Sequence, residues 1–320
     1  MLFSVSAKGI SQEITDSTLY IPQSEFQYAG SNRYTVTGIL PYNETKIKTL
    51  NFVIFTGITV GGMVGQHIVQ SNTIWNERSE FKFREDGEYA LWADKAGHFF
   101  GTYLSSYFFT EGFLQAGLSY DASNIWGTIL GLSYTTYVEI MDGYSEKWGF
   151  SPSDFYMNVA GAAFYLGQHY APFLQNFTPK FTYVPANWHG NKKRVPSDMF
   201  IDDYSSHTLW LSVNVHNLLP RDMQDYWPSW LELSFGYAVR NLCAPGYDCD
   251  PSISYPVSDV AWGNQKYIIA LDYNLVELLP DGSNFWNWFR QSINLFKLPS
   301  PAVEFGRGGT RFYLLYPFKL

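Results

Sequence analysis

The spacing of hydrophobic residues changes part-way along this chain, and this change limits the folds that the chain can adopt. The spacing is helical in four stretches, at residues 50–70, 91–114, 121–147 and 151–171. At residues 230–240 and 266–276, hydrophobic residues instead alternate with small or polar ones, as in a strand with two different faces. The sequence therefore predicts an α+β fold, in which a bundle of about four apolar, glycine-faced helices precedes antiparallel β-strands.

This change in spacing divides the chain into three predicted regions. Residues 1–49 form an extended lead-in, residues 50–178 a helical core, and residues 179–320 a mostly β C-terminal region. The boundary falls where prolines interrupt the helical pattern, at Pro179 and Pro185. A barrel made by one chain needs at least about 8 strands, so the strands are expected to form a partial barrel at most.

The first helical stretch, at residues 50–70, contains no charged residue and has about the length that crosses a bilayer. Gly57, Gly61 and Gly65 are four residues apart and share one helix face, which favours close packing between helices. Two interpretations stay open, a membrane span and a tightly packed core helix. Residues 284–297 have a helical period with aromatic residues on one side, which is typical of an amphipathic or interfacial helix.

The composition favours contact with lipid and excludes nucleic-acid binding. Charged residues make up 16% of the chain, below the roughly 25% of soluble domains, whereas aromatic residues make up 19%. Tyrosine and tryptophan rings suit a lipid interface, because one end of the ring can stay hydrated. The formal net charge of −8 provides no basic field for nucleic acid.

Two local features point to export. Val5-x-Ala7 has the form of a signal-peptidase site after a short apolar stretch, and is either the remnant of a secretory signal or a frayed terminus. No lipoprotein-type cysteine lies near the start. Cys243 and Cys249 are the only cysteines, and the Pro-Gly turn between them favours a disulfide over free thiols.

Polar residues at helical spacing cluster on the predicted helices and form the candidate site. The catalytic candidates are His98, Glu139, Asp142 and Asp94, and the supporting residues are Lys95, Ser145, Ser151, Asp154 and Asn158. Asp94 and His98 lie one helical turn apart, and antiparallel packing of the helices would bring the other groups to their level. The start Ser151-Pro152-Ser153-Asp154 has the form of a capping box with proline in the first turn.

Three kinds of site remain open for this cluster. Carboxylates with a histidine can hold a divalent metal, or a carboxylate can orient His98 as a general base. The favoured interpretation is a structural network in which these groups satisfy one another. The sequence indicates no cofactor, and it contains no GxSxG, HExxH or Walker motif. Gly306-Arg307-Gly308-Gly309 is expected to be a hairpin turn.

These residues resemble the signatures of an uncharacterised family of predicted periplasmic lipoproteins typified by YfiM. The first signature is Trp92-Ala93-Asp94-Lys95-Ala96-Gly97-His98, and the second runs from Glu139 to Gly161. The later Trp210-Leu211-Ser212 and Pro299-x-Pro301 resemble long Bacteroidetes-type versions, so that the resemblance covers roughly residues 75–320. A more distant similarity is to VanZ-like membrane proteins. The resemblance implies a bacterial envelope location, at the periplasmic face or outer membrane, and supplies no chemistry.

The leading functional hypothesis is a non-enzymatic envelope protein that associates with the outer membrane and contacts membrane lipid. One alternative is a hydrolase or transferase that acts on a lipid or cell-wall precursor through the His98 cluster. A further alternative is a subunit of a larger outer-membrane assembly, with an outer-membrane protein as its partner.

Overall fold

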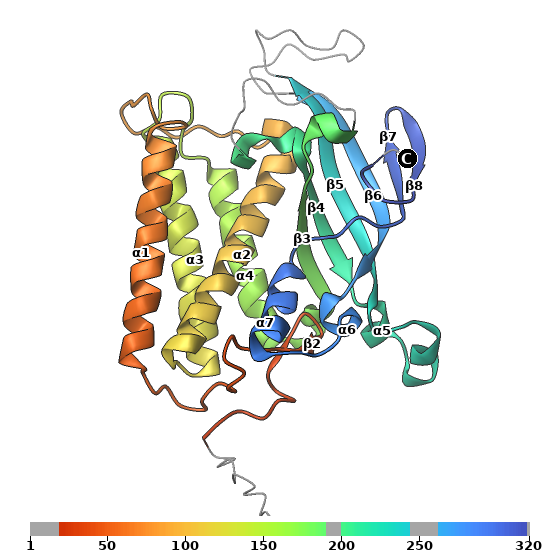
Figure 1. Ribbon diagram of the computed structural model, residues 1–320. Coiled ribbons are helices and arrows are strands. Elements are labelled where there is room, and N and C mark those ends of the chain that lie inside the picture. The colour runs from red at the N-terminus through yellow and green to blue at the C-terminus, as the bar shows by residue number, and fades with distance from the viewer. Residues whose placement is uncertain (1–18, 190–199, 244–261, 319–320) are drawn as a thin grey trace, which may run out of the picture.

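The computed structural model describes residues 19–189, 200–243 and 262–318, and a helical bundle lies beside an open sheet in it (Figure 1). The bundle contains α1 (Thr49–Ser71), α2 (Ala93–Ala116), α3 (Tyr120–Gly143) and α4 (Pro152–Tyr170). The sheet contains β3 (Phe177–Tyr183), β4 (His207–Val213), β5 (Leu231–Cys243), β6 (Trp262–Tyr273), β7 (Ala302–Gly306) and β8 (Gly309–Tyr313). The predicted α+β class, with helices before strands, is confirmed.

The six strands follow one another in chain order, and every neighbouring pair is antiparallel. The sheet is not closed, since β3 and β8 form its two edges. The predicted hairpin turn is confirmed, because Gly306 pairs with Gly309 at the β7–β8 connection. Smaller elements complete the described part of the fold: β1 (Gln27–Tyr28), β2 (Ser31–Asn32), α5 (Val215–Leu218), α6 (Leu275–Leu278) and α7 (Asn284–Ile293).

The helix starts follow from local capping. Ser151 caps α4 as predicted, since its Oγ accepts a hydrogen bond from the backbone N–H of Asp154 at 3.4 Å. Ser119 caps α3 in the same way: its Oγ accepts from the backbone N–H of Ala122 at 3.3 Å, so α3 begins at Tyr120.

Glycines in α3 and α4 meet the backbone of α2 at very short range. A Cβ added at Gly127 would lie 2.6 Å from the Thr110 nitrogen, and one at Gly131 would lie 2.8 Å from the Ser106 nitrogen. A Cβ at Gly161 in α4 would lie 2.2 Å from the Phe99 carbonyl oxygen. These three helices therefore approach one another as closely as their glycines allow.

The glycines of α1 have the opposite surroundings. A Cβ at Gly57, Gly61 or Gly65 would meet nothing within 4 Å. The most apolar 18-residue window of α1 is 0% buried, and by length and composition this is the one described helix that could cross a membrane. The interpretation of this stretch as a tightly packed core helix is therefore wrong.

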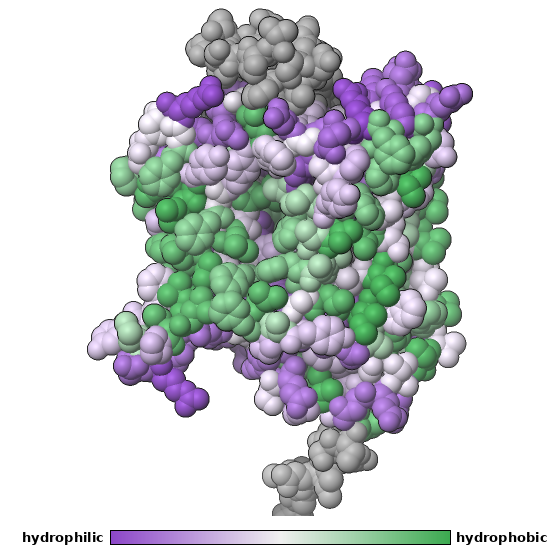
Figure 2. Space-filling view, turned by 180° about the vertical axis from the view of Figure 1, so that it is seen from behind, coloured by the Kyte–Doolittle hydropathy of each residue, from purple (hydrophilic) through white to green (hydrophobic). Residues whose placement is uncertain are grey.

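The buried side of the sheet contains many polar residues beside a small apolar cluster that includes Trp210 and Ile268, whereas the exposed side is mainly apolar. Ser212, Ser234 and Asp272 are buried, and they alternate along β4–β6 with large apolar residues that are 39% to 55% exposed: Leu211, Phe235, Tyr267, Ile269 and, on β7, Phe305. Seen from behind, the molecule has a band of hydrophobic residues across its middle, with hydrophilic residues above and below it (Figure 2). A sheet in water normally has the reverse arrangement, with its polar side outward.

Charged residues on the buried side of the sheet are paired with one another. The Lys180 ammonium lies 2.8 Å from Glu232 Oε2 and 3.1 Å from Asp272 Oδ2. In α7 the polar residues are also the buried ones, among them Arg290 and Gln291, while Phe285 is exposed. The amphipathic helix predicted here therefore turns its polar side inward.

The lead-in segment and the sheet both share core residues with the bundle. Arg33, from the lead-in, is buried and lies 2.7 Å from Glu111 on α2. Phe100 of α2 belongs to one buried cluster with Phe181 of β3 and Leu209 of β4. The bundle and the sheet therefore meet through hydrophobic contacts.

Candidate functional site

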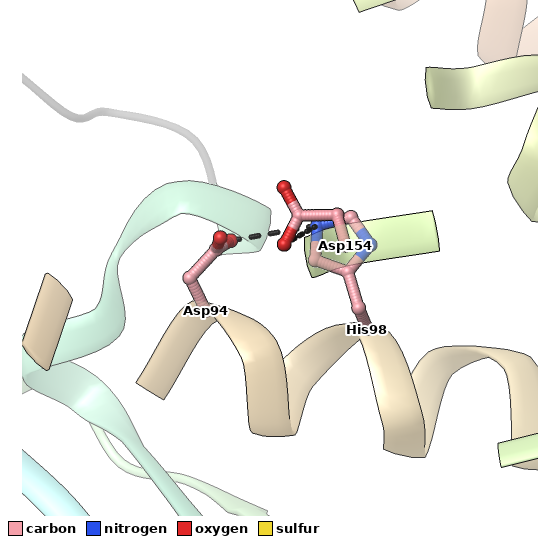
Figure 3. A group of neighbouring side chains, drawn as sticks. All are labelled: Asp94, His98 and Asp154. Carbon is pink, nitrogen blue, oxygen red and sulfur yellow. Dashed lines mark ion pairs between the residues drawn. The ribbon is translucent and has the colours of Figure 1, made fainter. Parts of the chain in front are cut away.

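The candidate catalytic residues meet at one end of the bundle. Asp94 and His98 come from the first turns of α2, Glu139 and Asp142 from the end of α3, and Asp154 from the first turn of α4. Figure 3 shows the carboxylates of Asp94 and Asp154 directed at the imidazole of His98. Antiparallel packing of α3 against α2 and α4 produces this convergence, as the sequence predicts.

Lys95 is the central cation of the cluster. Its ammonium lies 2.5 Å from Asp86 Oδ1, 2.7 Å from Asp94 Oδ2 and 2.5 Å from Asp154 Oδ1. The lysine side chain is only 2% exposed, so water screens these contacts little. Burial opposes the charge, but the three carboxylates raise the pKa of Lys95 above its usual value.

Both ring nitrogens of His98 face oxygen atoms. Nε2 lies 3.5 Å from Asp94 Oδ1 and 3.7 Å from Asp154 Oδ1, and Nδ1 lies 3.3 Å from both Glu139 Oε1 and Asn158 Oδ1. Burial lowers the pKa of His98, but the surrounding carboxylates outweigh it and raise this pKa to about 10. This geometry suits an imidazolium that donates on both sides.

Carboxyl groups outnumber cations in the cluster, and the fold raises the pKa of some of these carboxyl groups and lowers that of another. Burial and neighbouring carboxylates raise the pKa of Glu139 to about 8. Burial raises the pKa of Asp142 to about 7, although Trp75 Nε1 donates to its Oδ1 at 2.6 Å and opposes this shift. Burial would also raise the pKa of Asp94, but His98 and Lys95 together lower it.

Three buried polar atoms in the cluster make no hydrogen bond: Glu139 Oε1, Asp154 Oδ1 and Asn158 Nδ2. The two carboxylate oxygens have ion-pair partners in His98 and Lys95, whereas Asn158 Nδ2, on a residue that is 0% exposed, has neither kind of partner. The Asn158 amide oxygen, in contrast, accepts from Thr102 Oγ1 at 2.9 Å. A buried polar atom without a partner costs about 1–3 kcal/mol, so the Asn158 amide nitrogen favours an additional polar group in this space.

Two adjoining cavities meet at His98. The larger one has a volume of about 480 Å³ and a mostly apolar lining, including Phe100, Leu104 and Phe181. The smaller one has a volume of about 90 Å³ and is lined by acidic residues. His98 and Tyr204 line both cavities. A pocket that is apolar over most of its surface and polar at one end is typical of ligand sites.

Three residues of this site are not among the candidates that the sequence predicts. Asp86 contacts Lys95 and accepts from Ser151 Oγ at 2.7 Å, and Tyr204 donates a short hydrogen bond to Asp94. Trp75, which donates to Asp142, was not a candidate either. Asp86 and Trp75 lie in a charged stretch that reads as solvated, and Tyr204 follows the predicted domain boundary. The sequence therefore gives no signal that any of the three reaches the helices.

Ser145, one of the predicted supporting residues, does not join the cluster. Its Oγ contacts the backbone carbonyl of Ile74 at 3.5 Å, and it lines neither cavity. Ser151 donates a hydrogen bond to Asp86 and caps the start of α4. The disulfide prediction falls partly outside the described residues, since Cys249 lies in 244–261, and it stays a prediction.

The fit of a metal ion can be judged from the same geometry. One ligand atom from each of Asp94, His98 and Asp154 lies within 4.8 Å of the other two. The Lys95 ammonium already contacts both carboxylates, and His98 faces oxygens with both nitrogens. A metal would therefore have to displace a lysine and deprotonate a histidine that its surroundings keep charged. The described residues fit an ion-pair network better than a metal centre.

Comparison with known families agrees with the resemblance noted in the sequence. Residues 81–167 match the family described as "Predicted periplasmic lipoprotein (DUF2279)". This segment contains both signatures and every candidate catalytic residue, so the predicted resemblance is confirmed there. No curated protein and no solved structure matches the chain. The VanZ-like similarity stays a prediction.

The family description supports a coarse assignment of function. It agrees with the predicted bacterial envelope location, at the periplasmic face or the outer membrane. Over residues 81–167 the chain is therefore similar to a periplasmic-lipoprotein-type domain of unknown function, which is consistent with a location in the bacterial envelope.

Proposed function

We propose that this protein is seated in an envelope membrane, the outer membrane in the first place, as a non-enzymatic, lipid-contacting protein. An apolar belt carries the proposal. We define this belt as the exposed face of α1 together with the exposed side of the sheet. Both surfaces are apolar at positions where a protein in water would be polar.

The α1 part of the belt is formed by large aliphatic residues that are each more than half exposed: Leu50, Val53, Ile54, Ile58, Val60, Val64, Ile68 and Val69. Soluble monomers rarely expose contiguous apolar patches larger than a few hundred Å². Contact with lipid acyl chains would remove this surface from water at a gain of about 25 cal/mol per Å².

Exposed aromatic residues mark the two ends of the bundle. Trp92, before the first residue of α2, is 55% exposed, and Tyr170, at the last residue of α4, is 59% exposed. Rings at both ends of an apolar belt suit the two membrane–water interfaces. The ion-paired cluster lies at the Trp92 end of the bundle, where α2 and α4 begin and α3 ends. It is therefore outside α1, the proposed membrane span.

Flotation with vesicles tests this proposal. The detergent-purified protein is reconstituted with phospholipid and centrifuged through a sucrose gradient. The wild type should float with the lipid, whereas a variant with Ile54→Lys and Ile58→Lys should float several-fold less. Met223→Lys is the matched control, because Met223 is similarly exposed (46%) but belongs to a 3₁₀ helix outside the belt. A wild type that stays at the bottom, or a double variant that floats normally, contradicts the proposal.

A second candidate function is a hydrolase or transferase that acts on a lipid or cell-wall precursor. The observation that favours it is the meeting of an apolar cavity and an acidic pocket at His98. The raised pKa of His98 changes the role that we expect for it, from a general base to a cation that stabilises developing negative charge. Glu139, with its pKa of about 8, is then the group suited to proton transfer.

The His98→Ala variant separates these candidates. An enzyme role predicts that a cellular function is lost while the melting temperature hardly changes. A structural role predicts a large loss of stability, because removal of His98 leaves buried carboxylates without their partner. His169→Ala is a suitable control, since His169 contacts the exposed Asp121 instead of the cluster.

A third candidate, a subunit of a larger assembly, is supported by the edge strand β8. Within the described part of the chain, β8 pairs with β7 alone, and Phe312 on it is 82% exposed. Such an edge can accept a strand from a partner. A stable complex with an outer-membrane protein that Phe312→Lys abolishes would support this candidate.

A further inference from the structure

We propose that the larger cavity holds an acyl chain of a membrane lipid and that the adjoining acidic pocket receives the amine of the same lipid's headgroup. This inference rests on the proposed membrane location and names the lipid class that the site would select. The ligand is an amphiphile with a primary amine, such as an ethanolamine phospholipid.

The walls of the larger cavity suit a flexible hydrocarbon chain. Phe100, Leu104 and Leu209 supply apolar surface from α2 and β4, and Gly101 leaves an open notch in the wall. The volume of about 480 Å³ lies within the range of small-molecule sites. Gln66 of α1 is also part of this lining, so the cavity lies directly behind the helix that forms part of the belt.

The charged residues around the smaller cavity select the headgroup of the lipid. Lys95 and His98 supply two positive charges, and the smaller cavity is lined by six carboxyl groups: Asp86, Asp94, Glu139, Asp142, Asp154 and Asp202. An ammonium group would lower the raised pKa values of Glu139 and Asp142 and pair with their ionised forms, whereas an anionic headgroup would be repelled by the carboxylates. The volume of about 90 Å³ exceeds the roughly 10–15 Å³ that one water needs, so a small ammonium group fits.

The unpartnered amide nitrogen of Asn158 agrees with the same ligand. Asn158 Nδ2, on a residue that is 0% exposed and lines the apolar cavity, can donate to an ester or phosphate oxygen. Glu139 lines the acidic pocket, and its Oε1 can accept from an ammonium in addition to its ion pair with His98. One amphiphile that lies across His98 would give Asn158 Nδ2 the acceptor that the protein alone does not provide.

Photo-crosslinking in lipid vesicles tests the inference. Two phospholipids are compared that carry the same diazirine-labelled acyl chain, one with an ethanolamine and the other with a glycerol headgroup. We expect mass spectrometry to find adducts on residues 97–105 of α2 about tenfold more often with the ethanolamine lipid, which corresponds to about 1.4 kcal/mol. Adducts confined to the outside of α1 and of the sheet, or equal labelling of residues 97–105 by both lipids, would overturn the inference.

Two glycine variants distinguish the cavity from lipid on the surface. Gly101→Leu fills the cavity, whereas Gly57→Leu adds the same side chain on the open face of α1. Gly101→Leu should abolish the adducts in the cavity and keep those outside, and Gly57→Leu should keep both. Ser105→Leu is a second cavity-filling variant for the case that the first does not fold. Unchanged adducts on α2 in a folded cavity-filling variant contradict the inference.

The headgroup part of the inference has its own variant. Glu139→Gln with Asp142→Asn removes two carboxylates but keeps the shape, so the preference for ethanolamine over glycerol should disappear while labelling of the cavity persists. An unchanged preference contradicts this part. Flotation reports separately on the proposed function: a wild type that does not float, yet is labelled in the cavity in detergent, would refute the membrane location and keep the lipid site.

Discussion

Two helical regions of this molecule carry the same small-residue pattern in opposite surroundings. In α3, Gly127 and Gly131 lie against the backbone of α2, where no side chain fits. In α1, Gly57, Gly61 and Gly65 face open space. Small residues at a spacing of four therefore show that a helix has a smooth face, and they do not show what covers that face.

The polar groups differ between these regions in the same way. α2, α3 and α4 contribute buried ionisable side chains that are paired with one another, whereas α1 has no charged residue. The stability of the three inner helices thus comes from contacts within the protein, whereas the stability of α1 depends on what surrounds the protein. Matched substitutions in α1 and in the inner helices should therefore have different effects on stability and on attachment to lipid.

Lys95→Met should have the largest effect. The substitution leaves Asp94 and Asp154 buried without their cation, and breaking a buried ion pair in this way costs about 3–5 kcal/mol. Thermal unfolding in detergent measures the loss. Lys147→Met is the control, since its ion pair with Glu77 is exposed and worth at most about 1 kcal/mol. Equal melting temperatures for the two variants would contradict the structural role of the cluster.

Gly131→Leu tests the close approach of α3 to α2. A Cβ at this position lies 2.8 Å from the Ser106 nitrogen, and overpacking of this kind costs about 1–3 kcal/mol. Gly61→Leu makes the same change on α1, where nothing lies within 4 Å, and should not lower the melting temperature in detergent. If Gly61→Leu destabilises the protein as much as Gly131→Leu, the glycines of α1 have a partner within the protein.

Much of the bundle could be predicted from the sequence because its signals are local. Ser151, Pro152 and Asp154 define the start of α4 through the chemistry of neighbouring residues. His98 and Asp94 share a face through helical geometry alone. Convergence with Glu139 then follows from antiparallel packing, which requires only that consecutive helices be neighbours.

The remaining features depend on contacts between segments far apart in the chain. Asp86 lies in a charged loop and contacts Lys95, whereas Tyr204 lies beyond the helical core and contacts Asp94. No local sequence pattern indicates either contact. The sequence likewise does not predict which face of the sheet is buried. Alternation in β5 shows that its two faces differ, but contacts with segments far away in the chain decide that Ser234 is buried and Phe235 exposed.

The pH dependence of stability should be moderate. The pKa of Glu139 is raised in the fold, so the stability that its protonated form contributes is complete below pH 4.5 and is lost as the pH rises to about 8. The raised pKa of His98 acts in the same direction, with a loss between pH 6.5 and about 10. Melting temperatures should therefore fall from pH 5 to pH 9. One pKa unit corresponds to about 1.4 kcal/mol.

The variant Glu139→Gln checks the origin of this slope. Glutamine cannot titrate, so the melting temperature of the variant should change less than that of the wild type between pH 5 and pH 8. Glu77→Gln, at an exposed position, should keep the wild-type slope. A Glu139→Gln profile that matches the wild type would show that Glu139 does not titrate in this range.

The smallest effect is expected on α1. Ile58→Ser removes an apolar side chain that is 70% exposed, so the melting temperature in detergent should change by an amount equivalent to about 0.5 kcal/mol or less. The same substitution in a vesicle should weaken the attachment to lipid, because the lost contact is with the surroundings. The matched change within the bundle is Leu114→Ser, since Leu114 on α2 is 7% exposed and should cost several kcal/mol in either medium. If Ile58→Ser and Leu114→Ser destabilise the detergent-solubilised protein equally, α1 is covered by protein and the contrast between the two regions fails.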